Sequence, residues 1–124
     1  MIKDKKILIV DDEVDVTGLA EKFLKLEGFK TITCNSGKEA LDVLENDYNE
    51  IALVLLDILM PEMSGFTVLK EIKANENYKD IMIVMFTVLD NQIEKARELG
   101  ADGYLKKPFP GKELIKFVKD KLNV

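Results

Sequence analysis

The sequence predicts an α/β domain built on a doubly wound, five-stranded parallel sheet. Five β-rich runs alternate with five amphipathic helical segments along the chain. Two of the runs are apolar at every position, as is typical of strands that helices cover on both faces. The length of 124 residues fits one domain of roughly 100 to 150 residues and is too short for an eight-stranded barrel.

The first two strand–helix units follow simple local rules. The run Lys6 to Val10 precedes a helix predicted from Val14 to Glu27, which Gly28 ends as a C-terminal cap. The apolar residues of this helix recur at the spacing of one buried face, namely Val16, Leu19, Ala20 and Phe23. The run Lys30 to Cys34 precedes a helix from Ser36 to Asn46, which opens on the capping-box pattern Ser-Gly-Lys-Glu.

Three further units complete the pattern, with strands and helices predicted at Ile51 to Leu56, Ser64 to Ala74, Ile81 to Phe86, Asp90 to Leu99, Gly103 to Lys106 and Pro110 to Leu122. Ile51 to Leu56 is the expected centre of the sheet because it has no polar residue. Turn-forming residues precede the third helix, and Pro110 opens the fifth. The fourth helix is mostly charged, so we expect it to be the least firmly held. It has three residues to bury, Ile93, Ala96 and Leu99.

Composition excludes several classes of function. The formal net charge of −5 disfavours direct binding to nucleic acid, whose partners usually present a basic face. With no histidine and one cysteine, the chain cannot form an intrachain disulfide, a Cys/His zinc cluster or a histidine-activated nucleophile. No apolar run approaches the ~20 residues that span a bilayer, and the amino terminus is not a signal peptide. We therefore expect a cytoplasmic protein without membrane contact, with Cys34 as a small buried hydrophobe.

Polar side chains follow four of the five predicted strands. They are Asp11, Asp12 and Glu13 after the first, Asp57 after the third, Thr87 after the fourth, and Lys106 and Lys107 after the fifth. In an open α/β sheet, ligands bind beyond the carboxyl ends of the strands. If the strand order is 2-1-3-4-5, as in flavodoxin-like folds, the switch point lies between the first and third strands. Three aspartates then converge at that point.

Converging carboxylates repel one another unless a cation compensates them. Oxygen ligands alone suit Mg²⁺, with Mn²⁺ as a possible substitute. Three carboxylates, one lysine and one divalent ion give a neutral pocket that also holds a hydroxyl. Such a pocket fits phosphoryl transfer to an aspartate. Each residue also has an ordinary interpretation, as a helix cap, a turn residue, a strand-end hydroxyl or a surface charge. Their joint placement at one edge of the sheet favours the site.

The same residues resemble the receiver domain of two-component response regulators, in order and spacing, over residues 1 to 124. The match rests on Asp11-Asp12, Asp57-Ile58-Leu59-Met60-Pro61 with Ser64-Gly65, Thr87, and Lys107-Pro108-Phe109. The resemblance implies that Asp57 is the phosphoacceptor and that Asp11, Asp12 and the Leu59 carbonyl join it as metal ligands. It implies that Lys107 and Thr87 bind the phosphoryl group. It also implies a cis bond before Pro108, which favours Lys107 over Lys106.

Tyr104 stands three residues before Lys107, at the position of the family's switch aromatic. The resemblance implies a two-state mechanism in which the phosphoryl group draws the Thr87 hydroxyl inward and Tyr104 enters the vacated space. The surface of the fourth helix, fifth strand and fifth helix then changes. Such a shift needs only a few kcal/mol of differential interaction.

The resemblance implies a signalling phosphoacceptor and not an enzyme. Its partners would be a sensor histidine kinase or a histidine phosphotransfer protein, which supplies the phosphohistidine, and a downstream protein target. An aspartate-nucleophile phosphatase is the first alternative, but it needs a general acid two residues after the nucleophile, where this chain has Leu59. A receiver-like module that binds without phosphorylation is the second. We expect one receiver domain with no effector domain after it, as a monomer or weak dimer.

Overall fold

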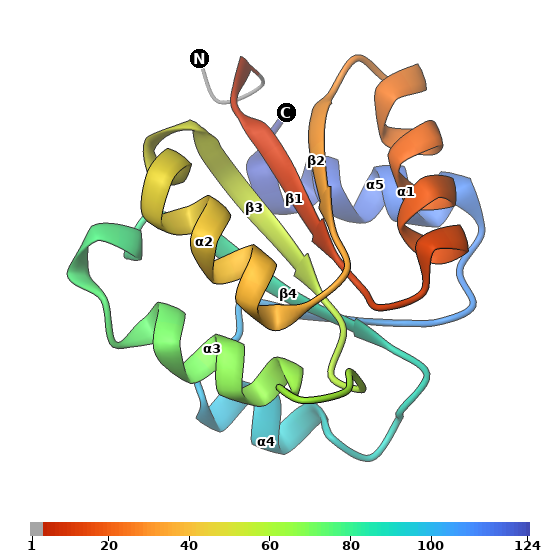
Figure 1. The fold of residues 1–124 in the computed structure, drawn as a ribbon. Helices are drawn as coiled ribbons and strands as arrows, with labels where there is room; N and C mark the ends of the chain where they lie inside the picture. Colours follow the sequence, from red (N-terminus) through yellow and green to blue (C-terminus); the bar gives the residue numbers. More distant parts are fainter. Residues whose placement is uncertain (1–3) are drawn as a thin grey trace.

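A five-stranded parallel sheet runs through the centre of the computed structural model, which describes residues 4–124 (Figure 1). The strands are β1 (Lys6–Val10), β2 (Lys30–Cys34), β3 (Ile51–Leu56), β4 (Met82–Thr87) and β5 (Gly103–Lys106). Their order in the sheet is β2-β1-β3-β4-β5, and every neighbouring pair is parallel. The predicted fold class and strand order are therefore confirmed.

Helices cover both faces of the sheet (Figure 1). They are α1 (Val14–Leu26), α2 (Gly37–Asp47), α3 (Gly65–Lys73), α4 (Ile93–Glu98) and α5 (Gly111–Leu122), with short 3₁₀ turns at Tyr48–Glu50 and Glu76–Tyr78. One core cluster packs α1 and α5 against the sheet, and the other packs α2, α3 and α4 against the opposite face. Within residues 4–124 no helix combines the length and the apolar character that a membrane crossing requires.

Successive residues of a strand point alternately into the two core clusters. In β1, Leu8 and Val10 belong to the α2–α3–α4 cluster, whereas Ile7 and Ile9 belong to the α1–α5 cluster. All residues of β3 are buried, as expected for the centre of the sheet. Each buried Leu, Ile or Val contributes about 1.5–3 kcal/mol of transfer free energy. The two-sided burial of β1 and β3 thus fixes the strands that carry the aspartates at their ends.

Helix α1 packs the predicted face against the sheet except at one position, since Ala20 is buried and Val16 and Phe23 are partly buried against the same core cluster. Leu19 was expected to be buried, but 52% of it is exposed. The buried residues of α1 are Thr17, Ala20 and Leu24. The Thr17 hydroxyl donates a hydrogen bond to the Val14 carbonyl, so this polar side chain is buried with its donor satisfied. The apolar pattern alone could not show that Leu19 lies at the exposed margin of this face and that Leu24 lies inside it.

Helix α4 is shorter than predicted. It begins at Ile93 and not at Asp90, and 41% of Ile93 is exposed, contrary to expectation. Asp90 instead forms an ion pair of 3.1 Å with Lys106, before the helix begins. Ala96 is the fully buried residue of α4. The helix therefore rests on very little apolar contact, which agrees with its predicted weak anchoring.

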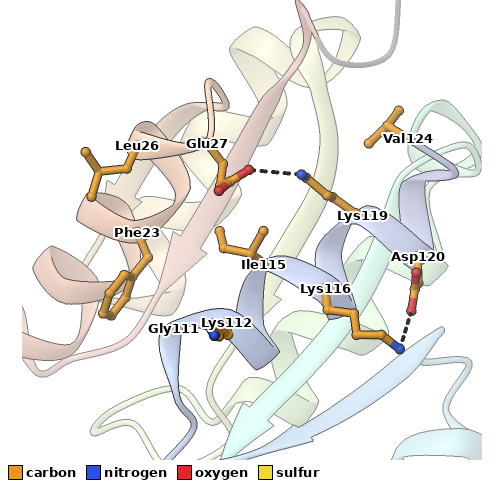
Figure 2. Close-up of a pocket in the computed structure, with 10 residues that line it drawn as sticks. All are labelled: Phe23, Leu26, Glu27, Gly111, Lys112, Ile115, Lys116, Lys119, Asp120 and Val124. Carbon is orange, nitrogen blue, oxygen red and sulfur yellow. Dashed lines mark hydrogen bonds and ion pairs between the residues drawn. The ribbon is translucent and has the colours of Figure 1, made fainter.

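A groove of about 490 Å³ lies between α1 and α5 (Figure 2). Phe23 and Ile115 are half-buried in it. At one end, an ion pair of 2.9 Å joins Glu27, the residue directly after α1, to Lys119 of α5. An added Cβ at Gly111 would lie 2.6 Å from the Phe23 ring, so the glycine allows α5 to begin directly against α1. These contacts fix α1 relative to α5 on this face.

Cys34 is 1% exposed at the end of β2, and its thiol is free. Burial, followed by the charge of Glu39, raises the pKa of this thiol to about 12. Because the thiolate is the reactive form, we expect native protein to resist alkylation by iodoacetamide at neutral pH and to react fully in denaturant. Mass spectrometry of the two samples measures this. Rapid alkylation of native protein would contradict the burial of Cys34.

Candidate functional site

Asp11 and Asp57 leave neighbouring strands at the same edge of the sheet. Val10 pairs with Leu56 at the ends of β1 and β3, and the Asp57 N–H donates to the Val10 carbonyl at 3.0 Å. Asp11 is 0% exposed and Asp57 is 4% exposed. Asp12 is exposed at the surface beside them. Carboxylate oxygens of all three aspartates lie within 4.8 Å of one another, so the predicted convergence occurs.

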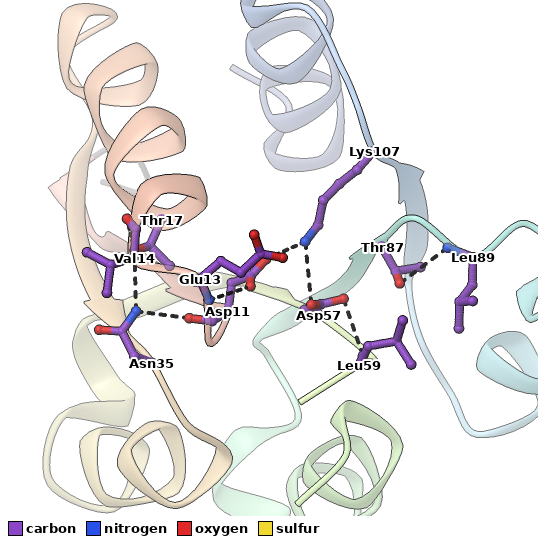
Figure 3. Close-up of polar contacts among 10 residues, drawn as sticks. All are labelled: Asp11, Glu13, Val14, Thr17, Asn35, Asp57, Leu59, Thr87, Leu89 and Lys107. Atoms are coloured by element: carbon purple, nitrogen blue, oxygen red, sulfur yellow. Dashed lines mark hydrogen bonds and ion pairs between the residues drawn. The ribbon is translucent and has the colours of Figure 1, made fainter. Parts of the chain in front are cut away.

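Lys107 extends between the two buried aspartates (Figure 3). Its Nζ forms an ion pair with Asp11 and a second, of 3.4 Å, with Asp57. The Lys107 N–H donates to the Thr87 carbonyl at 2.8 Å, and the Lys107–Pro108 peptide bond is cis. The Lys106 side chain is 54% exposed and pairs with Asp90 outside the site. The structure thus places Lys107, and not Lys106, beside the aspartates.

The site has fewer cations than anions. Burial is the main cause that raises the pKa of Asp57 above its usual value, and the charge of Asp11 adds to it. Lys107, the Thr87 hydroxyl and the Leu59 N–H act in the opposite direction. With all three aspartates ionised, Lys107 leaves two negative charges uncompensated. Their oxygen-only donor set and mutual spacing fit one divalent ion such as Mg²⁺.

Thr87 and Tyr104 each form a hydrogen bond with the backbone of the same residue, Leu89. Thr87 is fully buried at the end of β4, and its hydroxyl accepts a hydrogen bond from the Leu89 N–H at 3.4 Å. The Tyr104 hydroxyl donates to the carbonyl of Leu89. Tyr104 itself is half-buried in β5. The Leu89 backbone therefore connects the two predicted switch residues.

Leu59 follows Asp57 closely but has its side chain in solvent. Its N–H donates to Asp57 Oδ1 at 3.4 Å, and 52% of the residue is exposed. The backbone at this position is thus tied to the phosphoacceptor candidate. The role of the Leu59 carbonyl as a metal ligand stays a prediction.

Two residues that support the site were not identified by reasoning from residue chemistry. Asn35, after β2, donates from its side-chain amide to the Asp11 carbonyl at 2.9 Å and to the Thr17 hydroxyl at 3.4 Å (Figure 3). Gly65 lies so close to the Asp57 backbone that an added Cβ would be 2.0 Å from the Asp57 carbonyl oxygen. An amide after a strand gives a weak signal of this role. Gly65 was identified from the sequence only as part of the family motif, with no role predicted for it.

Comparison with known proteins agrees with this geometry. The family model of the response regulator receiver domain matches residues 7–119. Response regulator SaeR of Staphylococcus aureus is 40% identical over 111 residues, which cover 88% of this chain and 46% of that protein. The chain therefore spans about half the length of the curated relatives it matches.

Solved structures show the same fold. The chemotaxis response regulator CheY4 of Vibrio cholerae superposes with a TM-score of 0.86 at 29% identity, covering 94% of this chain and 97% of that one. A CheY-like receiver domain protein of Methanospirillum hungatei gives a TM-score of 0.86 at 30% identity, covering 96% and 94%. The chain therefore belongs to the response regulator receiver domains, which are signalling domains of two-component systems.

Proposed function

We propose that this chain is a phosphorylation-dependent signalling switch that accepts a phosphoryl group on Asp57. The observation that carries the proposal is the position of Asp57, a nearly buried carboxylate with Lys107 on one side and the Asp11–Asp12 pair on the other. Burial disfavours its charge. Conversion into an acyl phosphate moves charge toward groups that Lys107 and a metal can neutralise.

The donor is the phosphohistidine of a sensor histidine kinase or a histidine phosphotransfer protein, because this chain has no histidine. An oxygen of Asp57 forms the new bond to phosphorus as the phosphorus–nitrogen bond breaks, and the electron pair leaves with the imidazole, which takes up a proton. The Lys107 ammonium and the Thr87 hydroxyl bind phosphoryl oxygens. Asp11, Asp12, Asp57 and the Leu59 carbonyl would hold Mg²⁺ or Mn²⁺, which supplies charge neutralisation for the transferred group.

The phosphoryl group would act on the rest of the domain through Thr87. If Thr87 turns toward a phosphoryl oxygen, it releases the Leu89 N–H, and the Leu89 carbonyl also holds Tyr104. The residues after β4 lead directly into α4, whose anchoring is weak. A rearrangement of α4, β5 and α5 would then present a different surface to a downstream protein target.

The test is phosphorylation by a small acyl phosphate in the presence of Mg²⁺, followed by intact mass. We expect wild-type protein to gain one phosphoryl group, Asp57→Asn to gain none, and Asp90→Asn, at an exposed acidic position, to behave as wild type. Chelation of the metal should abolish uptake. A wild-type protein that stays unmodified would favour a phosphorylation-independent binding module, and continuous phosphate release would favour the aspartate-nucleophile phosphatase.

Exposed apolar side chains on the elements around Lys107 fit a protein donor. Val14, Leu19 and Val88 are 67%, 52% and 55% exposed. Leu19 and Val88 line a depression of about 290 Å³ that also includes Lys107. An exposed apolar patch next to a reactive group is typical of a protein interface. We place the histidine protein on this surface.

Leu19→Ala is therefore expected to slow phosphotransfer from a histidine kinase about tenfold, because a truncated interface leucine costs roughly 1–2 kcal/mol. Phosphorylation by the small acyl phosphate should be unchanged, since that donor needs no docking surface. Leu26→Ala, at an exposed leucine of the same helix outside this depression, is the matched control. Equal slowing with both donors would place the defect in the site and not in docking.

A further inference from the structure

A second polar pocket lies at the opposite edge of the sheet from Asp57. It is formed by α2, by the end of α3 and by the two 3₁₀ turns that precede β3 and β4. Its volume is about 410 Å³, within the range of sites that bind small molecules. The lining residues are Leu41, Glu45, Tyr48, Glu71, Asn75, Asn77 and Tyr78. The proposed function uses none of them.

The pocket is negatively charged. Glu45 and Glu71 are its only ionisable lining residues apart from the two tyrosines, and neither forms an ion pair within residues 4–124. Other acidic residues of the helical surface, such as Asp42 and Asp120, have lysine partners. Two uncompensated carboxylates facing one cavity favour a cationic ligand.

Two tyrosine rings form the apolar part of the same pocket. Tyr48 and Tyr78 contact each other with ring centroids 5.6 Å apart and planes inclined by 56°. The electron-rich faces of tyrosine rings attract cations, and guanidinium groups also stack on them. The tyrosine pair thus adds a second feature that selects the same kind of ligand.

Tyr78 is a nearly buried residue whose hydroxyl is open to the pocket. It is 8% exposed, and in the part of the chain that the structure describes its hydroxyl forms no hydrogen bond. The hydroxyl oxygen is not itself enclosed, because every fully buried side-chain nitrogen and oxygen there has a partner. Burial raises the pKa of this hydroxyl, and the charges of Glu45 and Tyr48 raise it further, so the hydroxyl lies near two groups of the same pocket. The hydroxyl can therefore accept a hydrogen bond inside the pocket, and a ligand with several N–H donors would supply one.

We infer that this pocket binds a guanidinium group. Its planar face stacks on a tyrosine ring, and its five N–H donors can reach both carboxylates and the Tyr78 hydroxyl together. A primary ammonium has three donors at a single point, is more strongly hydrated and stacks less well. An isosteric urea has the planar shape without the charge. The inference therefore predicts a ranking of three ligands that share one alkyl chain.

The experiment titrates the protein with butylguanidinium, butylammonium and butylurea. Tyrosine fluorescence reports on the pocket, because the chain has no tryptophan and three tyrosines. Tyr104→Phe leaves only Tyr48 and Tyr78 as emitters, and amide shifts in NMR spectra locate the response. We expect saturable binding of butylguanidinium, several-fold weaker binding of butylammonium and none of butylurea.

The variant E45Q/E71Q should weaken butylguanidinium binding about tenfold, since two partly exposed ion pairs are lost. E94Q/E98Q removes two exposed charges on α4 and is the matched control, expected to bind as wild type. Tyr78→Phe keeps the ring and should weaken binding to a smaller degree. A Gly-Arg-Gly peptide that binds more tightly than butylguanidinium would indicate a protein arginine as the natural source, and weaker binding would indicate a free small molecule.

Binding that E45Q/E71Q leaves unchanged, or a response to butylurea equal to that of butylguanidinium, would overturn the inference. The failure of this inference is distinguishable from failure of the proposed function. Asp57 phosphorylation is measured at the other edge of the sheet, with the acyl phosphate, in the same variants.

Discussion

Lys107→Met is expected to lower the free energy of unfolding by about 3–5 kcal/mol in metal-free buffer at neutral pH, because it leaves buried carboxylates without their cation. Lys107 is the only lysine or arginine that pairs with Asp11 or Asp57 within residues 4–124. Both aspartates are nearly inaccessible, so water cannot replace it. Urea denaturation measures the change. Phosphoryl uptake from the acyl phosphate should also be lost.

The loss of folding stability in Lys107→Met should depend on pH. Lys107 is the largest influence that lowers the pKa of Asp57, whose folded-state pKa is already raised by burial. Removal of the lysine raises it further. An acid with a raised folded-state pKa favours the folded state at low pH, so the variant should regain stability as the pH falls through that pKa. The destabilisation should be largest at neutral pH and smaller in mild acid.

Lys106→Met is the matched control for this prediction. Lys106 precedes Lys107 in the chain, but its ion pair with Asp90 is exposed. We expect a change within about 0.5 kcal/mol, because exposed pairs contribute little. If the two variants proved equally stable, the Lys107 pairs would be no stronger than a surface contact.

Gly65→Ala is expected to disrupt the site by displacing the backbone that carries Asp57. The added Cβ would lie 2.0 Å from the Asp57 carbonyl oxygen and 2.9 Å from the Ile58 Cα. Backbone atoms cannot yield as a flexible side chain can, so α3 or the segment after β3 must shift. Such overpacking costs about 1–3 kcal/mol. The shift also moves Asp57, and we expect phosphorylation by the acyl phosphate to slow at least about tenfold.

Gly18→Ala provides the opposite expectation from the same chemical change. Apart from the adjacent residues and the helix's own backbone, no atom lies within 4 Å of an added Cβ at Gly18, which is exposed within α1. Alanine should therefore stabilise the domain by about 0.5–1 kcal/mol and leave phosphorylation unchanged. Urea denaturation and intact mass measure both variants. Wild-type phosphorylation in Gly65→Ala would show that the segment after β3 adjusts without moving Asp57.

The sheet topology and the edge of the sheet that carries the site could be predicted, because both depend on the order of apolar strands and amphipathic helices in the sequence. Alternation of strands and helices sets the fold class, and the wholly apolar β3 indicates the sheet centre. Parallel strands end at one edge, so residues that follow them must converge. For this reason the sequence alone predicts that Asp11, Asp57 and Lys107 lie together, although they are far apart in the chain.

The errors concern choices that pattern does not determine. Leu19 fits the helical period of a buried face as well as Leu24 does, and the packing of α1 against the sheet decides between them. Ile93 was placed inside for the same reason and is exposed. The contacts of Gly65 depend on how closely α3 approaches the end of β3. No local propensity encodes such a distance.

The main-chain hydrogen bond from Asp57 to the Val10 carbonyl bears on how such a domain tolerates sequence drift. The backbone hydrogen bonds between β1 and β3 hold Asp11 and Asp57 side by side. The hydrophobic residues of these strands can therefore be replaced by others of similar size without separating the two aspartates. Relatives with few identical interior residues can thus keep the same acidic constellation. Sequence divergence in this fold would therefore accumulate among the core residues of the strands and leave the arrangement of the aspartates unchanged.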